Sequence, residues 1–126
     1  MYICLIDDDD IFNALHEAVI QMVVPNARID IFKSGEQFKK AIEENRFATI
    51  KPDYIFLDIR MPDMDGFTLL EFLQMNHPLL FSNTRFFMLS STLDHRDLEK
   101  TRSFPMVKAF IGKPLTVELI GELMSK

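Results

Sequence analysis

Residues 54–66 have the sequence Tyr-Ile-Phe-Leu-Asp-Ile-Arg-Met-Pro-Asp-Met-Asp-Gly, which is the most informative segment of the chain for its class of fold. Its first four residues form a continuous apolar run, which is typical of a strand buried on both faces of a parallel sheet. The run ends abruptly at Asp58, so a carboxylate is expected at the carboxyl end of this strand. Residues 61–66 form a turn-rich loop in which Asp65 can cap a helix, and residues 69–73 supply that helix with an apolar face.

Four other apolar runs of strand length flank this stretch, two before it and two after it. The run at residues 2–6 stops at four consecutive aspartates, and the run at residues 27–32 stops just before a helix cap. The runs at residues 85–89 and 107–111 end in Ser90 and in a Gly-Lys-Pro turn, respectively. The chain therefore contains five predicted strands, each of which ends in polar or turn residues.

Helical patterns occupy the segments between these runs. The first predicted helix ends before Pro25, which stops the element. Its apolar residues recur at helical spacing and are Phe12, Leu15, Val19, Met22 and Val23. A second helix begins at a capping box, with Ser34 as the cap and Gln37 reaching back, and extends to about residue 45. Residues 116–124 close the chain as a helix.

The segment at residues 94–102 differs from the other helical segments because Leu98 is its single apolar residue. A helix that packs on a core needs a stripe of apolar residues. We therefore predict that any helix in this segment is weakly anchored. Segments with little buried area lie at the low-stability end of a fold, so this segment is the candidate for the part that moves.

Strands that alternate with helices predict an α/β fold, in which a five-stranded parallel sheet is doubly wound and carries helices on both faces. The chain has 126 residues, which matches the commonest size of one domain. Apolar residues make up 48% of the sequence, enough to fill one interior. We expect a single domain over residues 1–126 with no output domain.

Composition limits the partners and the location of the protein. The net charge of −5 and the absence of a Lys/Arg cluster disfavour binding to nucleic acid. No apolar stretch approaches the roughly 20 residues that cross a bilayer, and the N-terminus lacks the features of an export signal. A single cysteine, Cys4, lies within an apolar run and fits a reducing compartment. We therefore expect a soluble, cytoplasmic protein without a membrane partner.

Polar residues at the strand ends point to chemistry. Asp7 and Asp8 follow the first strand, Asp58 ends the third, and Ser90 and Lys113 follow the fourth and fifth. Ligands of open parallel sheets bind outside these carboxyl ends, where the chain order reverses, so the five side chains can converge in one crevice. Three carboxylates without His or Cys nearby suit Mg²⁺, and one lysine then makes the occupied site neutral. Asp58 is placed to attack phosphorus, with Ser90 and Lys113 as partners of the phosphoryl oxygens.

The same residues resemble the receiver domains of two-component response regulators. Residues 6–9 resemble the acidic-pair motif, residues 57–66 the phospho-acceptor loop, and residues 110–114 the motif of the switch aromatic and Lys-Pro. The Asp-x-x-Met-Pro-x-Met-Asp-Gly string is highly specific, and the resemblance covers nearly the whole chain. It implies a flavodoxin-like sheet with strand order 2-1-3-4-5.

The resemblance also implies a role for each site residue. Asp58 is the phospho-acceptor, and Asp7, Asp8, Asp58 and the backbone carbonyl of Arg60 surround the Mg²⁺ ion. Lys113 is the phosphate partner, and a cis peptide is expected between Lys113 and Pro114. Ser90 and Phe110 are the switch residues, which on phosphorylation alter the surface formed by the fourth helix, fifth strand and fifth helix.

The implied function is a signalling switch that is not an enzyme in its own right but helps to catalyse its own phosphorylation and dephosphorylation. A histidine kinase or a histidine phosphotransfer protein donates the phosphoryl group, and a downstream protein reads the changed surface. Three positions depart from the commonest pattern of the family: Ser90 replaces Thr, Phe110 replaces Tyr, and Arg60 replaces Asn. Arg60 and Thr92 lie where the family tunes dephosphorylation, so the lifetime of the phosphorylated state stays open.

Other interpretations of these residues remain. An aspartyl-phosphate phosphatase of the haloacid-dehalogenase type would use Asp8 and Asp10, although its signature is incomplete here. A receiver that serves mainly as a docking module is a second alternative. Asp9 and Asp10 are expected to cap the first helix or to face solvent. His16, His77 and His95 lack metal-ligand spacing and receive no role.

Overall fold

The computed structural model describes residues 1–125 as five strands that alternate with five helices. In chain order the elements are β1 (Tyr2–Ile6), α1 (Asp10–Val23), β2 (Arg28–Phe32), α2 (Gly35–Glu43), β3 (Tyr54–Asp58), α3 (Gly66–Asn76), β4 (Arg85–Ser90), α4 (His95–Arg102), β5 (Val107–Gly112) and α5 (Val117–Met124). Every predicted element is present. The boundaries differ by one or two residues, as is usual where element ends fray.

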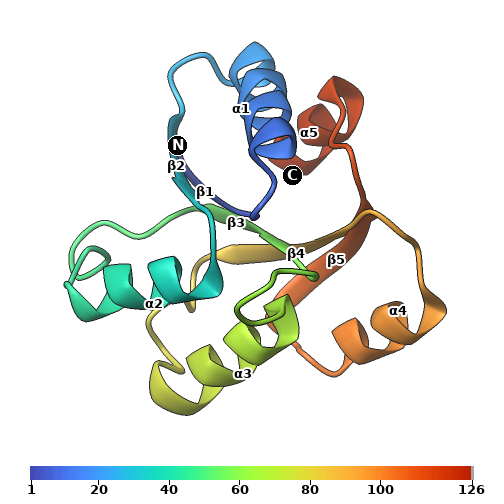
Figure 1. Ribbon diagram of the computed structural model, residues 1–126. Coiled ribbons are helices and arrows are strands. Elements are labelled where there is room, and N and C mark those ends of the chain that lie inside the picture. The colour runs from blue at the N-terminus through green and yellow to red at the C-terminus, as the bar shows by residue number, and fades with distance from the viewer. Residues whose placement is uncertain (126) are drawn as a thin grey trace.

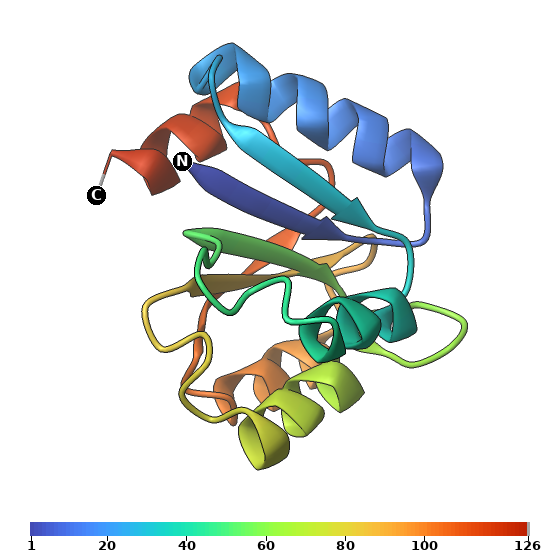
Figure 2. The ribbon, with the colours of Figure 1, turned by 90° about the vertical axis from the view of Figure 1, so that its left-hand side faces the viewer.

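The strands form one parallel sheet in the order β2-β1-β3-β4-β5. Helices α1 and α5 cover one face of the sheet, and α2, α3 and α4 cover the other (Figures 1 and 2). The predicted doubly wound, flavodoxin-like fold is therefore confirmed. Because the chain leaves β1 toward β2 and returns to β3 on the other side of β1, the order reverses at the carboxyl ends of β1 and β3.

Side-chain alternation along the strands divides the interior into two cores. Cys4, Ile6 and Leu57 point toward the core under α2 and α3, whereas Leu5 and Phe56 point toward the core under α1 and α5. This division follows from the twofold period of a strand, which sends neighbouring side chains to opposite faces. Both faces of the central strands are buried, as their continuous apolar sequences predicted.

The buried face of α1 differs from the predicted one. Leu15 is 42% exposed and Met22 is 73% exposed, although both were expected in the core. The face that packs on the sheet is instead formed by Asn13, His16, Val19 and Ile20. Each of these two polar side chains makes one hydrogen bond there: Asn13 Nδ2 donates to the Asp7 carbonyl, and His16 Nε2 accepts from the Leu115 amide. Asn13 Oδ1 is buried and has no hydrogen-bond partner.

Helices α2 and α3 begin at the caps that the sequence predicted. Ser34 accepts a hydrogen bond from the Gln37 amide at the start of α2, and Asp65 accepts one from the Thr68 amide at the start of α3. The Gln37 side chain also reaches back, but it bonds the amide of Lys33, one residue before the cap. Within the described residues, no helix is long and apolar enough to span a membrane.

Candidate phosphoryl-acceptor site

Three carboxylates meet at the point where the strand order reverses. Asp7 and Asp8 follow β1, and Asp58 is the last residue of β3. One carboxylate oxygen from each lies within 4.8 Å of the others. Asp7 and Asp58 are buried and Asp8 is exposed, so the cluster is closed on the side of the sheet and open on the side of Asp8.

Lys113 inserts its ammonium between the two buried carboxylates. Its Nζ lies 2.6 Å from Asp7 Oδ2 and 3.1 Å from Asp58 Oδ1, and its side chain is 4% exposed. Burial alone would lower the pKa of Lys113, but the hydrogen bond to Asp7 and the charge of Asp58 raise the pKa above its usual range. Lys113 is therefore a permanent cation of this site at neutral pH.

Asp58 has the electrostatic environment of a reactive carboxylate. Its burial, followed by the negative charge of Asp7, raises its pKa to about 6, against the opposing effect of Lys113. Asp58 is thus ionised at neutral pH, although its charge is disfavoured. A group that binds or neutralises this charge gains free energy from doing so.

The loop between β3 and α3 folds back onto Asp58 through Gly66. The Gly66 amide donates to the Ile59 carbonyl at 2.8 Å. A Cβ at Gly66 would lie 2.6 Å from the backbone oxygen of Asp58, so this approach requires glycine. The Asp63 carboxylate extends from the loop and accepts the Glu36 amide of α2 at 2.9 Å. The loop is therefore fastened at both the sheet and α2.

The loop between β1 and α1 is ordered by hydrogen bonds of its own side chains. Asp7 Oδ1 accepts the Asp9 amide at 2.9 Å, and the Asp7 carbonyl accepts Asn13 Nδ2 at 2.9 Å. Asp9 caps α1 by accepting the amides of Ile11 and Phe12, while Asp10 pairs with Lys33. The expectation that Asp9 and Asp10 serve as cap and surface residues is confirmed.

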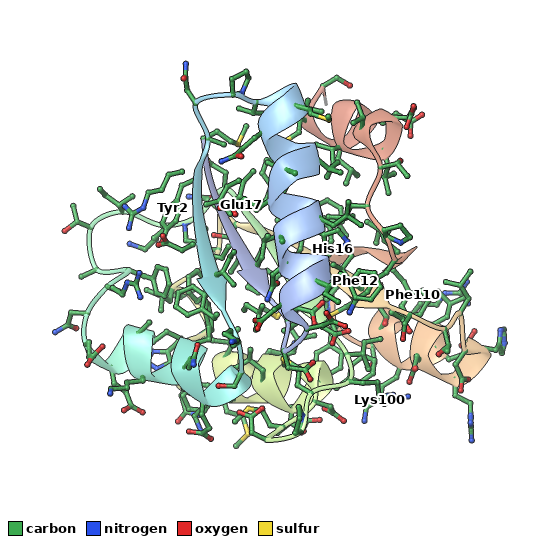
Figure 3. All side chains as sticks on the ribbon, turned by 45° about the horizontal axis from the view of Figure 1, so that its top comes forward. Tyr2, Phe12, His16, Glu17, Lys100 and Phe110 are labelled. Carbon is green, nitrogen blue, oxygen red and sulfur yellow. The ribbon has the colours of Figure 1, made fainter. Side chains whose placement is uncertain are left out.

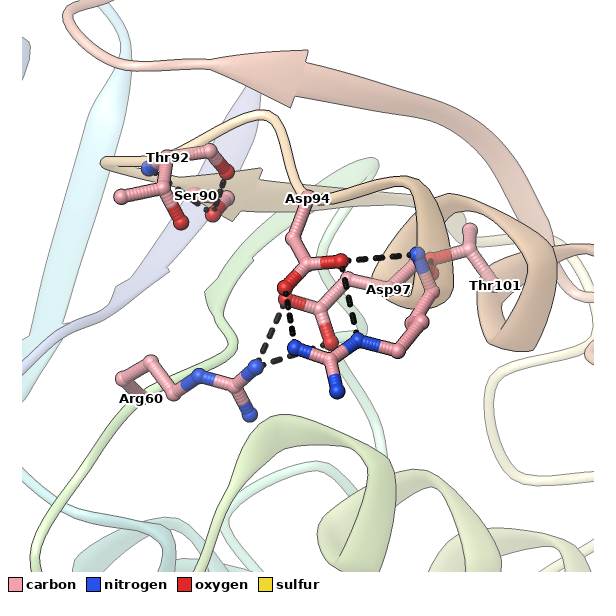
Figure 4. Close-up of polar contacts among 7 residues, drawn as sticks. Arg60, Ser90, Thr92, Asp94, Asp97 and Thr101 are labelled. Atoms are coloured by element: carbon pink, nitrogen blue, oxygen red, sulfur yellow. Dashed lines mark hydrogen bonds and ion pairs between the residues drawn. The ribbon is translucent and has the colours of Figure 1, made fainter.

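The two predicted switch residues lie beside the site without joining it. The Ser90 hydroxyl is buried and is engaged with Thr92, donating to its carbonyl and accepting its amide (Figure 4). Phe110 is half-buried and packs against the core on the side of α2 and α3. The peptide bond between Lys113 and Pro114 is cis, the geometry that the family resemblance implied.

Arg60 points its side chain away from the carboxylates. Its guanidinium donates to both carboxylate oxygens of Asp97 on α4, at 2.9 and 2.7 Å (Figure 4). The Asp97 side chain is 8% exposed, and its backbone carbonyl accepts the Thr101 hydroxyl. The loop between β3 and α3 is therefore linked to α4 by a partly buried ion pair two residues from Asp58.

The carboxylate cluster fits a hard divalent cation. Asp7 and Asp58 are buried and share the single ammonium of Lys113, at 2.6 and 3.1 Å, while Asp8 adds a third negative charge beside them. One positive charge does not balance three carboxylates, and a divalent cation would neutralise the remainder. The oxygen-only donors of Asp7, Asp8 and Asp58 are those that Mg²⁺ prefers.

Sequence reasoning missed three residues that order the site, namely Asn13, His16 and Asp97. Asn13, His16 and Ile20 share one face of α1 at intervals of three and four residues, but the apolar pattern of the sequence favoured another face. Asp97 has no sequence signal, because its partner Arg60 lies 37 residues away and on another element.

Solved structures share this fold at similar length. A two-component response regulator from Cytophaga hutchinsonii is 30% identical, with a TM-score of 0.89 over 98% of this chain and 93% of that chain. A two-component response regulator from Legionella pneumophila is 25% identical, with a TM-score of 0.84 over 99% and 95% of the two chains.

Curated relatives are longer than this chain. A protein-glutamate methylesterase/protein-glutamine glutaminase from Vibrio cholerae is 30% identical over 98 residues, which are 75% of this chain and 25% of that protein. The sensory transduction protein BceR from Halalkalibacterium halodurans is 34% identical over 86 residues, which are 66% of this chain and 34% of that protein. Each match thus spans less than two thirds of the relative.

The family model of the response regulator receiver domain matches residues 3–124. That range contains β1 apart from Tyr2, the other four strands and the whole carboxylate cluster. The chain therefore belongs to the response regulator receiver domain family, the signalling module of two-component systems.

Proposed function

We propose that Asp58 accepts a phosphoryl group in a Mg²⁺-dependent reaction and that the protein signals by the resulting change of its surface. The observation that carries this proposal is the placement of Lys113 Nζ between the carboxylates of Asp7 and Asp58, at the edge of a cluster suited to a divalent cation. A nucleophile, a cation site and a fixed ammonium are the parts that phosphoryl transfer needs.

In the proposed reaction a carboxylate oxygen of Asp58 attacks the phosphorus of a phosphohistidine on a kinase or phosphotransfer protein. The new P–O bond replaces the P–N bond, and the imidazole nitrogen of the donor leaves with its electron pair. Mg²⁺, held by Asp7, Asp8, Asp58 and the Arg60 carbonyl, would neutralise phosphoryl oxygens when bound. Lys113 stays paired with Asp7 and turns its remaining hydrogens to the phosphoryl oxygens.

The proposed output is a repacking of the surface of α4, β5 and α5. Phosphorylation adds three acceptor oxygens beside β4, and Ser90 would exchange its bonds to Thr92 for one of them. Phe110 would follow inward, and a downstream protein would bind the altered surface. The single-domain organisation, the cytoplasmic location and the absence of an enzymatic activity of its own stay predictions.

Intact-mass spectrometry after incubation with Mg²⁺ and a small phosphodonor tests the proposal. The wild-type protein is expected to gain the mass of one phosphoryl group, and Asp58→Asn is expected to gain none, because an amide oxygen is a poor nucleophile. Asp65→Asn is the matched control, since Asp65 caps α3 in the same loop and lies outside the carboxylate cluster.

A phosphorylated Asp58→Asn variant would overturn the assignment of the acceptor. An unmodified wild-type protein would favour the docking-module alternative. The phosphatase alternative needs Asp8 and Asp10 as a catalytic pair, whereas Asp10 is exposed and pairs with Lys33 in the turn between β2 and α2. Steady turnover of a phosphate ester that depends on Asp8 and not on Asp58 would support the phosphatase alternative.

A further inference from the structure

His16 is a buried group that the proposed reaction does not use. It lies on α1, one turn after Phe12 (Figure 3), and is 1% exposed. Burial lowers its pKa to about 4, so the ring is neutral at physiological pH and can offer a nitrogen lone pair. Nε2 uses that lone pair to accept the backbone N–H of Leu115 at 3.1 Å.

This hydrogen bond lies next to the residue that carries the reactive ammonium. Lys113 is fixed on one side, where its amide donates to the Ser90 carbonyl of β4 at 2.8 Å. Pro114 has no N–H, so the Leu115 amide is the next backbone donor along the chain. His16 therefore fixes the other side of Lys113, and the two bonds bracket the residue between β4 and α1.

The same helix also contacts the ammonium group. The Phe12 ring lies 5.6 Å from the His16 ring, and Lys113 Nζ lies 4.5 Å from the centroid of Phe12. The α1 residue between them, Asn13, holds the Asp7 carbonyl. One end of α1 thus orders both the first carboxylate of the cluster and the loop that delivers the cation.

We infer that His16 is a positioning residue for phosphoryl transfer, which holds the Lys113–Leu115 loop so that Lys113 Nζ lies between Asp7 and Asp58. The inference rests on the proposed phosphorylation of Asp58. Its physical basis is geometric: a loop held at one point in place of two lets Nζ leave the position between the carboxylates. Small misplacements of a reacting group lower rates strongly, by as much as about 100-fold for 1 Å.

Two substitutions distinguish the hydrogen-bond acceptor of His16 from the space that its ring fills. His16→Leu fills the space but leaves the Leu115 amide without an acceptor, whereas His16→Gln places an oxygen near the position of Nε2. With Mg²⁺ and a small phosphodonor, we expect His16→Leu to slow phosphorylation about tenfold and His16→Gln to retain most of the rate. Val19→Ala is the control for general loosening, because Val19 is buried on the same face of α1 and belongs to the core.

A second measurement does not depend on phosphorylation. Amide hydrogen exchange of the unphosphorylated protein is expected to be faster at Leu115 in His16→Leu, and unchanged there in His16→Gln and Val19→Ala. If the wild-type protein took no phosphoryl group, the proposed function would be wrong. The exchange data would still test whether the hydrogen bond from Leu115 to His16 orders the loop.

Three results would overturn the positioning role. They are a wild-type rate in His16→Leu, equal slowing in His16→Gln, and equal slowing in Val19→Ala. If the Leu115 amide stayed protected from exchange in His16→Leu, the hydrogen bond from Leu115 to His16 would not be a second point of attachment for the loop. Slowing confined to His16→Leu, together with loss of protection at Leu115, would support the role.

Discussion

At the scale of single residues, the site holds charges that the folded protein tolerates at a cost. Asp58 and Asp7 are both buried and share one ammonium, that of Lys113. The raised pKa of Asp58 expresses this cost, since a carboxyl whose pKa is raised by folding destabilises the folded state wherever it is ionised. Reactivity and stability therefore oppose each other at this residue.

Asp58→Asn is expected to stabilise the metal-free protein. The pKa of Asp58 is raised to about 6, so at pH 7 both the folded and unfolded states are ionised and the full cost is present. Removing the charge should raise the free energy of unfolding by about 3 kcal/mol. Urea denaturation at pH 7 with a chelator measures this difference. A less stable variant would show that the ion pair with Lys113 outweighs the cost of burying the charge of Asp58.

His16 is expected to make stability fall in acid. Its pKa is lowered by folding to about 4, so between pH 6.5 and pH 4 the unfolded state binds a proton that the folded state does not. Stability is therefore lost as the pH falls through this window, by about 2 kcal/mol between pH 7 and pH 5.

Urea denaturation of the wild type and His16→Gln at several pH values measures this loss. The comparison cancels the effect of Asp58, whose raised pKa acts in the opposite direction between pH 6 and pH 4. Parallel pH profiles for the two proteins would mean that the imidazole does not titrate as its burial requires.

At the scale of elements, α4 is the helix with the least apolar anchorage. Its buried residues are Asp97 and Thr101, and Leu98 is half-buried. Its attachments include the Arg60 ion pair and Lys100, whose Nζ lies 4.9 Å from the centroid of Phe67. The sequence predicted a weakly anchored helix here, and the structure shows that polar contacts take the place of an apolar stripe.

Arg60→Ala is expected to loosen α4 selectively. The substitution removes the cation that pairs with the nearly buried Asp97 carboxylate. This loss should cost about 2 kcal/mol, between the values of exposed and buried pairs. Hydrogen exchange should rise over residues 95–102. Arg102→Ala is the matched control, since Arg102 forms an exposed pair with Glu99 on the same helix. Equal rates of hydrogen exchange over residues 95–102 in both variants would show that the Arg60 ion pair does not stabilise α4.

At the scale of the whole molecule, a bound cation is linked to folding because the carboxylates converge only when the sheet is formed. A ligand present at 100 times its dissociation constant stabilises the folded state by about 2.7 kcal/mol. Mg²⁺ should therefore raise the midpoint of thermal unfolding. Asp8→Asn should abolish most of this rise, while changing the metal-free protein little, since Asp8 is exposed.

Asp10→Asn serves as the control for this titration. Asp10 belongs to the same run of aspartates but lies in α1 and pairs with Lys33, so the Mg²⁺-dependent rise should persist. A rise of equal size in Asp8→Asn would remove Asp8 from the cation site, and loss of the rise in both variants would point to general charge screening.

The elements, the class of fold and the acidic and lysine residues of the site could all be predicted from the sequence. These features have local causes. Apolar runs specify buried strands, Ser34, Asp65 and Thr116 cap helices through bonds to nearby amides, and parallel strands bring their carboxyl ends to one edge. The family resemblance then added the strand order, which composition and periodicity do not contain.

The contacts that position the site residues could be seen only in the folded structure. The contacts of His16 with Leu115 and of Arg60 with Asp97 join residues 99 and 37 positions apart. Whether a polar side chain is buried depends on the partner that it meets, and that partner is set by packing. Periodicity therefore placed Leu15 and Met22 of α1 in the core, where the folded protein has Asn13 and His16. Hydrogen bonds made in the folded state allow Asn13 and His16 to be buried, although hydrophobicity alone favours burying Leu15 and Met22.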